Sequence, residues 1–221
     1  MDYINQRVTK SIVQVRMDVI DNCKTNAFVV RGLHANYVID TGFGSLTSQH
    51  LSELLATDKD TYIINTHFHW DHIWGNAFFD KGIIIQHNKC KNFTELYWDD
   101  MCKKYSHYKH GIVKRANPSI TFDSQMELNS EMLLFYTPGH SDDSISAYFY
   151  ADRALFVGDN FGDNDTDIIP VLDSQPDSFK NTLQKYANLK PDYILSGHND
   201  VRGMETLNKM IDFVKDKVNG A

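Results

Sequence analysis

The chain has 221 residues, enough for one large domain or two small ones with a sizeable core. Its 42% hydrophobic and 23% charged residues are typical of a globular protein, and its formal net charge of −7 argues against a nucleic-acid partner. Cys23, Cys90 and Cys102 lack C-x-x-C spacing, which predicts reduced thiols. Residues 1–10 lack the apolar core of a signal peptide, and no run approaches about 18 apolar residues. We therefore predict a soluble, cytoplasmic protein without a membrane partner.

Alternating apolar residues at the start of the chain predict strands over residues 11–20, 26–31 and 36–40, followed by a helix over 47–56. The third strand ends in Asp40-Thr41-Gly42-Phe43-Gly44, where glycines allow a sharp turn. Asp40 has two interpretations: it orients a metal-bound histidine from behind, or it caps the turn.

A buried strand over residues 62–65 and a helix over 73–79 enclose the stretch Thr66-His67-Phe68-His69-Trp70-Asp71-His72. Imidazole and carboxylate are the usual protein ligands of zinc and similar cations. Residues two apart at a strand end point the same way, so His67 and His69 can bind one metal. Asp71 and His72 are offset and suit a second metal roughly 3.5–4 Å away. The alternative is that Asp71 caps a helix and the histidines are solvated.

Residues 87–110 follow a predicted strand over 82–86 and are rich in aromatic residues. We interpret them as a helix and loop over the cleft and hypothesise that aromatics such as Trp98 and Tyr105 line a substrate pocket. The alternative is that these aromatics belong to the core.

The second half of the chain contains three single residues of ligand type, His140, Asp159 and His198, each directly after a glycine and just beyond a short strand. The predicted strands cover residues 119–122, 125–128, 131–137, 144–150, 154–157 and 193–195, and the predicted helices cover 177–187 and 204–218. Strand ends that converge on one sheet edge would bring these ligands to His67. We predict one domain, residues 1–221, with two sheets and helices outside them. The acidic run 163–167 lacks the glycine and glutamate of a calcium loop and is interpreted as a solvated loop.

These residues resemble the signature of the metallo-β-lactamase superfamily, H-x-H-x-D-H followed by single His, Asp and His ligands. The matching residues are His67, His69, Asp71, His72, His140, Asp159 and His198. Asp40, in Ile-Asp-Thr-Gly, matches a buried aspartate usual in the family. The resemblance spans residues 11–215 and implies an α/β fold, the αββα four-layer sandwich, with the site at one edge between the sheets.

The resemblance also implies the ligand sets. One metal is held by His67, His69 and His140, a second by Asp71, His72 and His198, and Asp159 bridges both. We expect two divalent ions, with zinc first and iron or manganese open, because histidine and aspartate accept all three.

The function implied is a dinuclear hydrolase in which a hydroxide between the metals attacks a small ester, thioester, lactone or amide. Asp71 is the expected catalytic residue, because it can orient that hydroxide or take its proton. The ligand set is glyoxalase II-like, but the C-terminal helical extension of that enzyme is not matched. The sequence names neither the donor of the leaving-group proton nor the oligomeric state.

Three other functions stay open. A mononuclear non-haem iron persulfide dioxygenase would use part of the same ligand set. A β-lactamase-type amide hydrolase is less favoured, because Asp159 stands where some zinc β-lactamases have cysteine. A non-catalytic metal-binding module is the third, although structural zinc sites are closed and four-coordinate.

Overall fold

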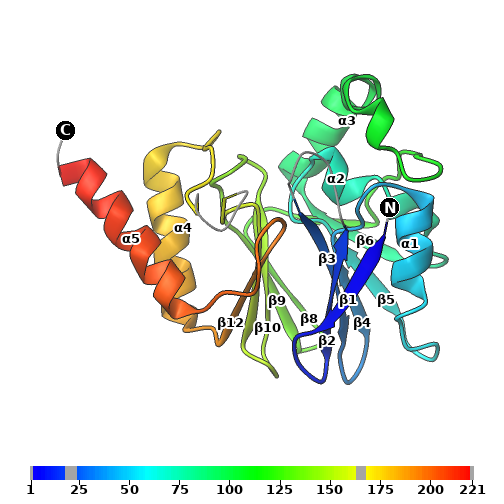
Figure 1. The fold of residues 1–221 in the computed structure, drawn as a ribbon, viewed down its shortest axis with the longest axis horizontal. Helices are drawn as coiled ribbons and strands as arrows, with labels where there is room; N and C mark the ends of the chain where they lie inside the picture. The colour runs from blue at the N-terminus through cyan, green and yellow to red at the C-terminus, as the bar shows by residue number, and fades with distance from the viewer. Residues whose placement is uncertain (1, 18–23, 163–167, 220–221) are drawn as a thin grey trace.

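The computed structural model describes residues 2–17, 24–162 and 168–219, with side chains up to residue 215. Cys23, the end of the predicted strand 11–20 and the acidic run 163–167 lie outside the described residues. Two sheets face each other, and helices cover the outer side of each (Figure 1). This arrangement confirms the predicted αββα sandwich.

The larger sheet has seven strands in the order of the chain. Neighbouring strands are antiparallel from β1 to β4 and parallel from β4 to β7. Parallel neighbours need a crossover, and α1 (Ser45–Ser52) and α3 (Asn88–Lys104) lie in two of these connections. The strands are β1 (Tyr3–Arg7), β2 (Ile12–Met17), β3 (Thr25–Arg31), β4 (Asn36–Ile39), β5 (Thr61–Ile64), β6 (Ile83–His87) and β7 (Ile120–Phe122).

The smaller sheet has five strands in the order β12-β11-β10-β9-β8. Only the β11–β12 pair is parallel, and α4 (Pro176–Leu189) lies in its crossover. The last helix, α5 (Met204–Asn219), packs beside α4. The strands are β8 (Gln125–Leu128), β9 (Met132–Tyr136), β10 (Ile145–Phe149), β11 (Ala154–Gly158) and β12 (Tyr193–Ser196).

Three apolar interfaces hold the four layers together. The largest lies between the sheets, where Phe28 of β3 meets Phe156 of β11 with ring centroids 5.2 Å apart. A second lies between the five-stranded sheet and helices α4 and α5, and a third between the seven-stranded sheet and α1. Burial of both faces explains why many strands are continuous apolar runs instead of alternating patterns.

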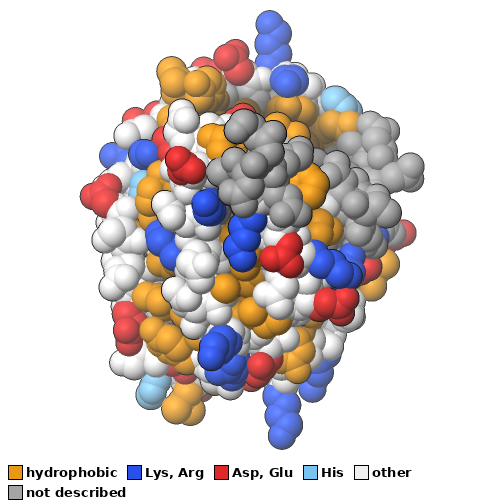
Figure 2. Space-filling view, turned by 90° about the vertical axis from the view of Figure 1, so that its left-hand side faces the viewer, with side chains coloured by type: hydrophobic (Ala, Val, Ile, Leu, Met, Phe, Trp, Pro, Cys, Tyr) orange, Lys and Arg blue, Asp and Glu red, His pale blue; other side chains and the backbone are white. Residues whose placement is uncertain are grey.

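The outer helical layer has a mixed surface. On the side that carries α4 and α5, positive, negative and apolar side chains are interspersed among the described residues (Figure 2). The amphipathic pattern of these helices explains this, because their apolar faces are used against the sheet. Within the described ranges, no helix is both long and apolar enough to cross a membrane.

The prediction differs from the structure at two elements. Strand β1 was not predicted, because it is an edge strand with four of five residues exposed and has no buried periodicity. The helix predicted over 73–79 was wrong in its bounds: α2 covers Trp70–Ile73, and a 3-10 turn covers Asn76–Phe78. The His72 carbonyl accepts a hydrogen bond from the Thr41 N–H at 2.8 Å, which takes the place of a helical bond.

Candidate metal centre

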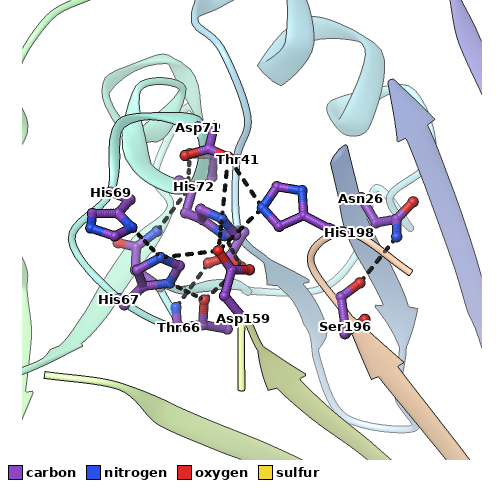
Figure 3. A network of polar contacts seen from close by, with 12 residues as sticks. Asn26, Thr41, Thr66, His67, His69, Asp71, His72, Asp159, Ser196 and His198 are labelled. Carbon is purple, nitrogen blue, oxygen red and sulfur yellow. Dashed lines mark hydrogen bonds and ion pairs between the residues drawn. The ribbon is translucent and has the colours of Figure 1, made fainter. Parts of the chain in front are cut away.

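The seven residues predicted as ligands lie together at one edge of the sandwich. The loop after β5 and helix α2 carry the first four, and the segments after β9, β11 and β12 carry one each. Figure 3 shows six of them pointing toward one another, namely His67, His69, Asp71, His72, Asp159 and His198. Their atoms form two groups suited to a metal ion: His67, His69, His140 and Asp159, and Asp71, His72 and His198. Their role as ligands stays a prediction.

The first group is built from three imidazole nitrogens. His69 Nδ1 lies 3.0 Å from His67 Nε2 and 3.1 Å from His140 Nε2. The Asp159 Oδ2 atom completes the group at 3.5 Å from His67 Nε2 and 3.7 Å from His140 Nε2. These atoms converge on one point, and nitrogen and oxygen atoms of this kind suit a divalent cation.

The second group lies next to the Asp159 carboxylate of the first group. Asp71 Oδ2 lies 3.5 Å from His72 Nε2 and 3.5 Å from His198 Nε2. Asp159 Oδ2 lies 3.3 Å from the same atom of His72 and 3.1 Å from that of His198. One carboxylate oxygen therefore touches nitrogens of both groups, which is the position that a bridging ligand needs.

The far nitrogens of three histidines are held by other parts of the protein. His72 Nδ1 lies 2.8 Å from Asp40 Oδ2, and His198 Nδ1 lies 2.6 Å from the Lys24 carbonyl oxygen, so both donate. The Thr66 hydroxyl donates to Asp40 Oδ2 at 2.8 Å and accepts from His67 Nδ1 at 3.1 Å. With protons on the three Nδ1 atoms, the Nε2 lone pairs of these rings face the centre.

Two buried atoms of the centre indicate that a cation fits. His72 Nε2 and Asp159 Oδ1 have no hydrogen-bond partner among the described residues. Buried polar atoms normally have one, and an unsatisfied atom marks an ion or ligand site. A divalent cation would satisfy both, since each is an atom type that coordinates metal.

The charge of the centre also favours a cation. Burial lowers the pKa of His69 to about 4 and that of His67 well below its usual value, so both rings are neutral at neutral pH. Burial would also lower the pKa of His72, but the carboxylates of Asp159, Asp71 and Asp40 raise it well above its usual value. The second group therefore attracts positive charge, which a metal ion supplies in place of a proton.

The contacts of Asp40 and the position of Asp71 in α2 bear on their two interpretations. Asp40 is buried, with a φ of 59°, and its Oδ1 accepts from the Thr66 N–H at 2.8 Å. It therefore orients His72 and the ligand loop from behind. Asp71 is not a helix cap, because the N-cap of α2 is His69 and Asp71 lies inside the helix.

Buried amides support the ligands, and sequence reasoning missed them. Asn160 Oδ1 accepts from the His140 N–H at 2.9 Å, and its amide donates to the Thr137 carbonyl at 2.7 Å. Asn65 and Asn76 bond each other at 2.8 and 3.0 Å below the ligand loop. The one available signal was position: Asn65 ends a buried strand, and Asn160 follows Asp159.

The helix-and-loop prediction for residues 87–110 agrees with α3 and a 3-10 turn at Ser106–Tyr108. A cavity of about 270 Å³ lies between this segment and the ligand loop, and His69 is part of its wall. Tyr97 and Tyr105 line the cavity, whereas Trp98 packs on the cluster around Trp74. The segment therefore contributes both to a pocket and to the core.

Comparison with known proteins gives the same architecture. The profile described as "Metallo-beta-lactamase superfamily" matches residues 20–198. A Caenorhabditis elegans protein, "Beta-lactamase-like protein 2 homolog", is 26% identical over 188 residues, which are 80% of this chain and 56% of that protein. The chain thus spans little more than half of that relative. The human "Acyl-coenzyme A thioesterase MBLAC2" is 25% identical over 215 residues, 83% of this chain and 76% of that protein.

A solved structure has the same fold. The metallo-β-lactamase FIM-1 from Pseudomonas aeruginosa, in its mono-zinc form, superposes with a TM-score of 0.76 at 16% identity and covers 98% of this chain and 96% of that one. The architecture that the chain shares with FIM-1 is the αββα sandwich, and a histidine and aspartate cluster lies at one edge of it in this chain. The chain belongs to the metallo-beta-lactamase superfamily.

Proposed function

We propose that the protein is a dinuclear zinc hydrolase that cleaves a small ester, thioester, lactone or amide. One observation carries the proposal: Asp159 Oδ2 lies 3.1 to 3.7 Å from nitrogens of both ligand groups. Two cations that share this oxygen would be close enough to act on one substrate atom. The thioesterase name of the human relative makes a thioester the first bond to test.

The chain's own residues have distinct tasks in this proposal. His67, His72 and Asp159 form a buried floor, whereas the side chains of His140 and Asp71 are 16% and 13% exposed and form the open side. Bound divalent cations would bring the pKa of water from about 15.7 toward 7 and polarise a carbonyl oxygen. Asp71 lies at the open side, where its carboxylate can orient water and accept a proton.

The proposal is tested by measuring metal content and bond cleavage on one sample. The protein is purified without added metal, its zinc, iron and manganese are quantified, and hydrolysis of thioesters, lactones and β-lactams is assayed beside oxygen uptake. We expect close to two zinc ions per chain and hydrolysis that a chelator abolishes. One iron per chain with persulfide-dependent oxygen uptake would contradict the proposal and favour the dioxygenase alternative.

The variant Asp159→Ala tests the bridging role directly. Removal of the shared oxygen should lower the metal content from two ions toward one and reduce kcat by at least about 100-fold, the usual scale for loss of a group that acts on the transition state. Asp192→Ala is a suitable control, because Asp192 is 60% exposed and pairs with Arg153 away from the centre. Full metal content with near wild-type turnover in Asp159→Ala would contradict the assignment.

A further inference from the structure

The cavity beside the first ligand group is an open pocket, and most of its lining is apolar or aromatic. Its lining includes Phe68, His69, Trp70, Tyr97, Met101 and Tyr105. Phe68 and Trp70 flank His69 in the ligand loop, so the same loop forms both the metal group and the cavity wall. A group bound in the cavity would therefore contact the His69 ring of the first ligand group.

The aromatic walls have fixed positions. Trp70 stacks on Tyr105, with ring centroids 4.8 Å apart and planes 15° apart, and on Tyr108 at 5.2 Å with the same angle. Phe68 contacts Tyr97 at 5.6 Å and Phe93 at 5.3 Å on the other side. Stacked and edge-on rings of this kind resist rotation, so the cavity is formed before any ligand enters.

The charges at the cavity are balanced. Asp100 and Lys104 both line it, so its lining contains one carboxylate and one ammonium group. Lys104 Nζ lies 4.9 Å from the centre of the Tyr105 ring. Because opposite charges are present in equal number, the cavity favours a neutral apolar group over a charged one.

The size of the cavity limits the group further. Its volume is about 270 Å³. A single methyl group would leave most of this space unfilled, whereas a phenyl-sized group would fill much of it and contact the aromatic walls.

On these observations we propose that the substrate is an acyl derivative whose acyl part is a neutral, aromatic-sized group, bound between Phe68, Tyr97, Trp70 and Tyr105. This inference rests on the proposed hydrolase function, because that function places the acyl carbonyl at the metal centre.

Two thioesters with the same leaving group test the proposal on the metal-loaded enzyme, the acetyl and phenylacetyl thioesters of N-acetylcysteamine. We expect kcat/KM to be at least about 10-fold higher for the phenylacetyl compound, the scale of discrimination by an apolar pocket. In Tyr97→Ala that ratio should fall several-fold. Leu96→Ala is the matched control, because Leu96 neighbours Tyr97 on α3, is 67% exposed and does not line the cavity.

A binding measurement separates this inference from the proposed hydrolysis. Phenylacetamide and acetamide are titrated while tryptophan fluorescence is recorded, because Trp70 is part of the wall. Saturable quenching by phenylacetamide alone, weakened in Tyr97→Ala, would support the pocket even if neither thioester is cleaved, and only the hydrolase proposal would then fail. Equal cleavage of the two thioesters, or quenching that Tyr97→Ala leaves unchanged, would overturn the inference.

Discussion

The carboxylate of Asp40 controls which ring nitrogen of His72 faces the candidate metal centre. Its Oδ2 accepts from His72 Nδ1 at 2.8 Å, and this fixes the Nε2 lone pair toward the second ligand group. The same oxygen accepts from the Thr66 hydroxyl, which in turn accepts from His67. Asp40 therefore positions His72 directly and His67 through Thr66.

The variant Asp40→Asn should therefore weaken metal binding, although the asparagine side chain has nearly the same size and shape as that of aspartate. Its amide can donate to His72 Nδ1, and this would move the ring proton to Nε2, the atom that has to bind metal. We expect affinity for the more weakly bound ion to fall by about 10–100-fold, measured by competition with a chromophoric chelator. Unchanged affinity at both positions would contradict this role for Asp40.

Asp143 is a buried carboxyl that the sequence analysis did not single out. It is fully buried, and burial raises its pKa to about 6 from a usual value of 3.8. Between about pH 4 and 6 the folded protein therefore keeps a proton that the unfolded chain loses. The free energy of unfolding consequently falls as pH rises through this interval, by about 3 kcal/mol from this group.

Asp143→Asn removes that ionisation and should remove its share of the pH dependence. The free energy of unfolding of the variant, relative to that of the wild type, should rise by up to about 3 kcal/mol between pH 4 and pH 7. The reason is that the asparagine side chain never becomes charged. Urea unfolding of both proteins with chelator present measures the difference at each pH. Parallel stability curves for the two proteins would show that Asp143 does not titrate in this range.

Among individual residues, those of the centre could be predicted to different degrees. His67 could be predicted because it stands at the end of a predicted strand, and His198 because it follows a glycine just beyond a strand. The family signature then assigned the two residues to different metal ions. Thr66 and Asn160 could not be predicted, because a threonine or asparagine after a strand is ordinary. Their roles depend on hydrogen bonds to His67 and to the backbone of His140, which only the folded chain brings together.

At the scale of elements, the turn after β12 brings the backbone very close to the centre. A Cβ atom added at Gly197 would collide with Asp159 Oδ1 and lie 2.8 Å from Cε1 of His72. The glycine before His198 is therefore required by this close approach of the backbone. The sequence pattern had indicated only that a glycine precedes the ligand.

Gly197→Ala should displace ligands of both groups and lower activity by about 100-fold or more, because misplacement by 1 Å is enough for such a loss. Gly203→Ala is the matched control, since a Cβ atom there meets nothing within 4 Å and Gly203 belongs to the same part of the chain. Metal content and kcat/KM of both variants are compared with the wild type. Equal behaviour of the two alanine variants would contradict the importance of this contact.

The elements themselves were predicted with uneven success for a physical reason. Buried strands such as β5 and β11 are bounded by polar turns, so the apolar runs gave their positions. Strand β1 pairs with β2 through its backbone while most of its side chains stay in solvent, and such pairing leaves no pattern. Helix α2 is short because the Thr41 N–H binds the His72 carbonyl, a contact between distant segments.

For the whole molecule, the αββα architecture was predicted from the superfamily resemblance and is confirmed, whereas one domain over residues 1–221, the cytoplasmic location and the small-molecule partner stay predictions. The order of strands within each sheet was not predicted, since it depends on which strand edges pair through backbone hydrogen bonds. In the five-stranded sheet, for example, β12 pairs with β11 across the connection that contains α4.

Removal of metal should destabilise the whole molecule, because an ion that binds only the folded form adds to its stability. At a free concentration of 100 times the dissociation constant this contribution is about 2.7 kcal/mol, and for a chain of this size it corresponds to a Tm change of about 5–10 °C. Thermal unfolding with and without chelator measures it. Re-addition of zinc should restore the original Tm, and a Tm insensitive to chelator would contradict binding at the buried centre.

The ligands of the first group come from distant parts of the chain: His69 and His140 are 71 residues apart, yet their nitrogens lie 3.1 Å from each other. Contacts this far apart in sequence close a long loop and form late in folding. Interactions absent from the transition state act on the unfolding rate and leave the folding rate nearly unchanged. A metal bound here would therefore lengthen the lifetime of the folded enzyme without shortening the time it takes to form.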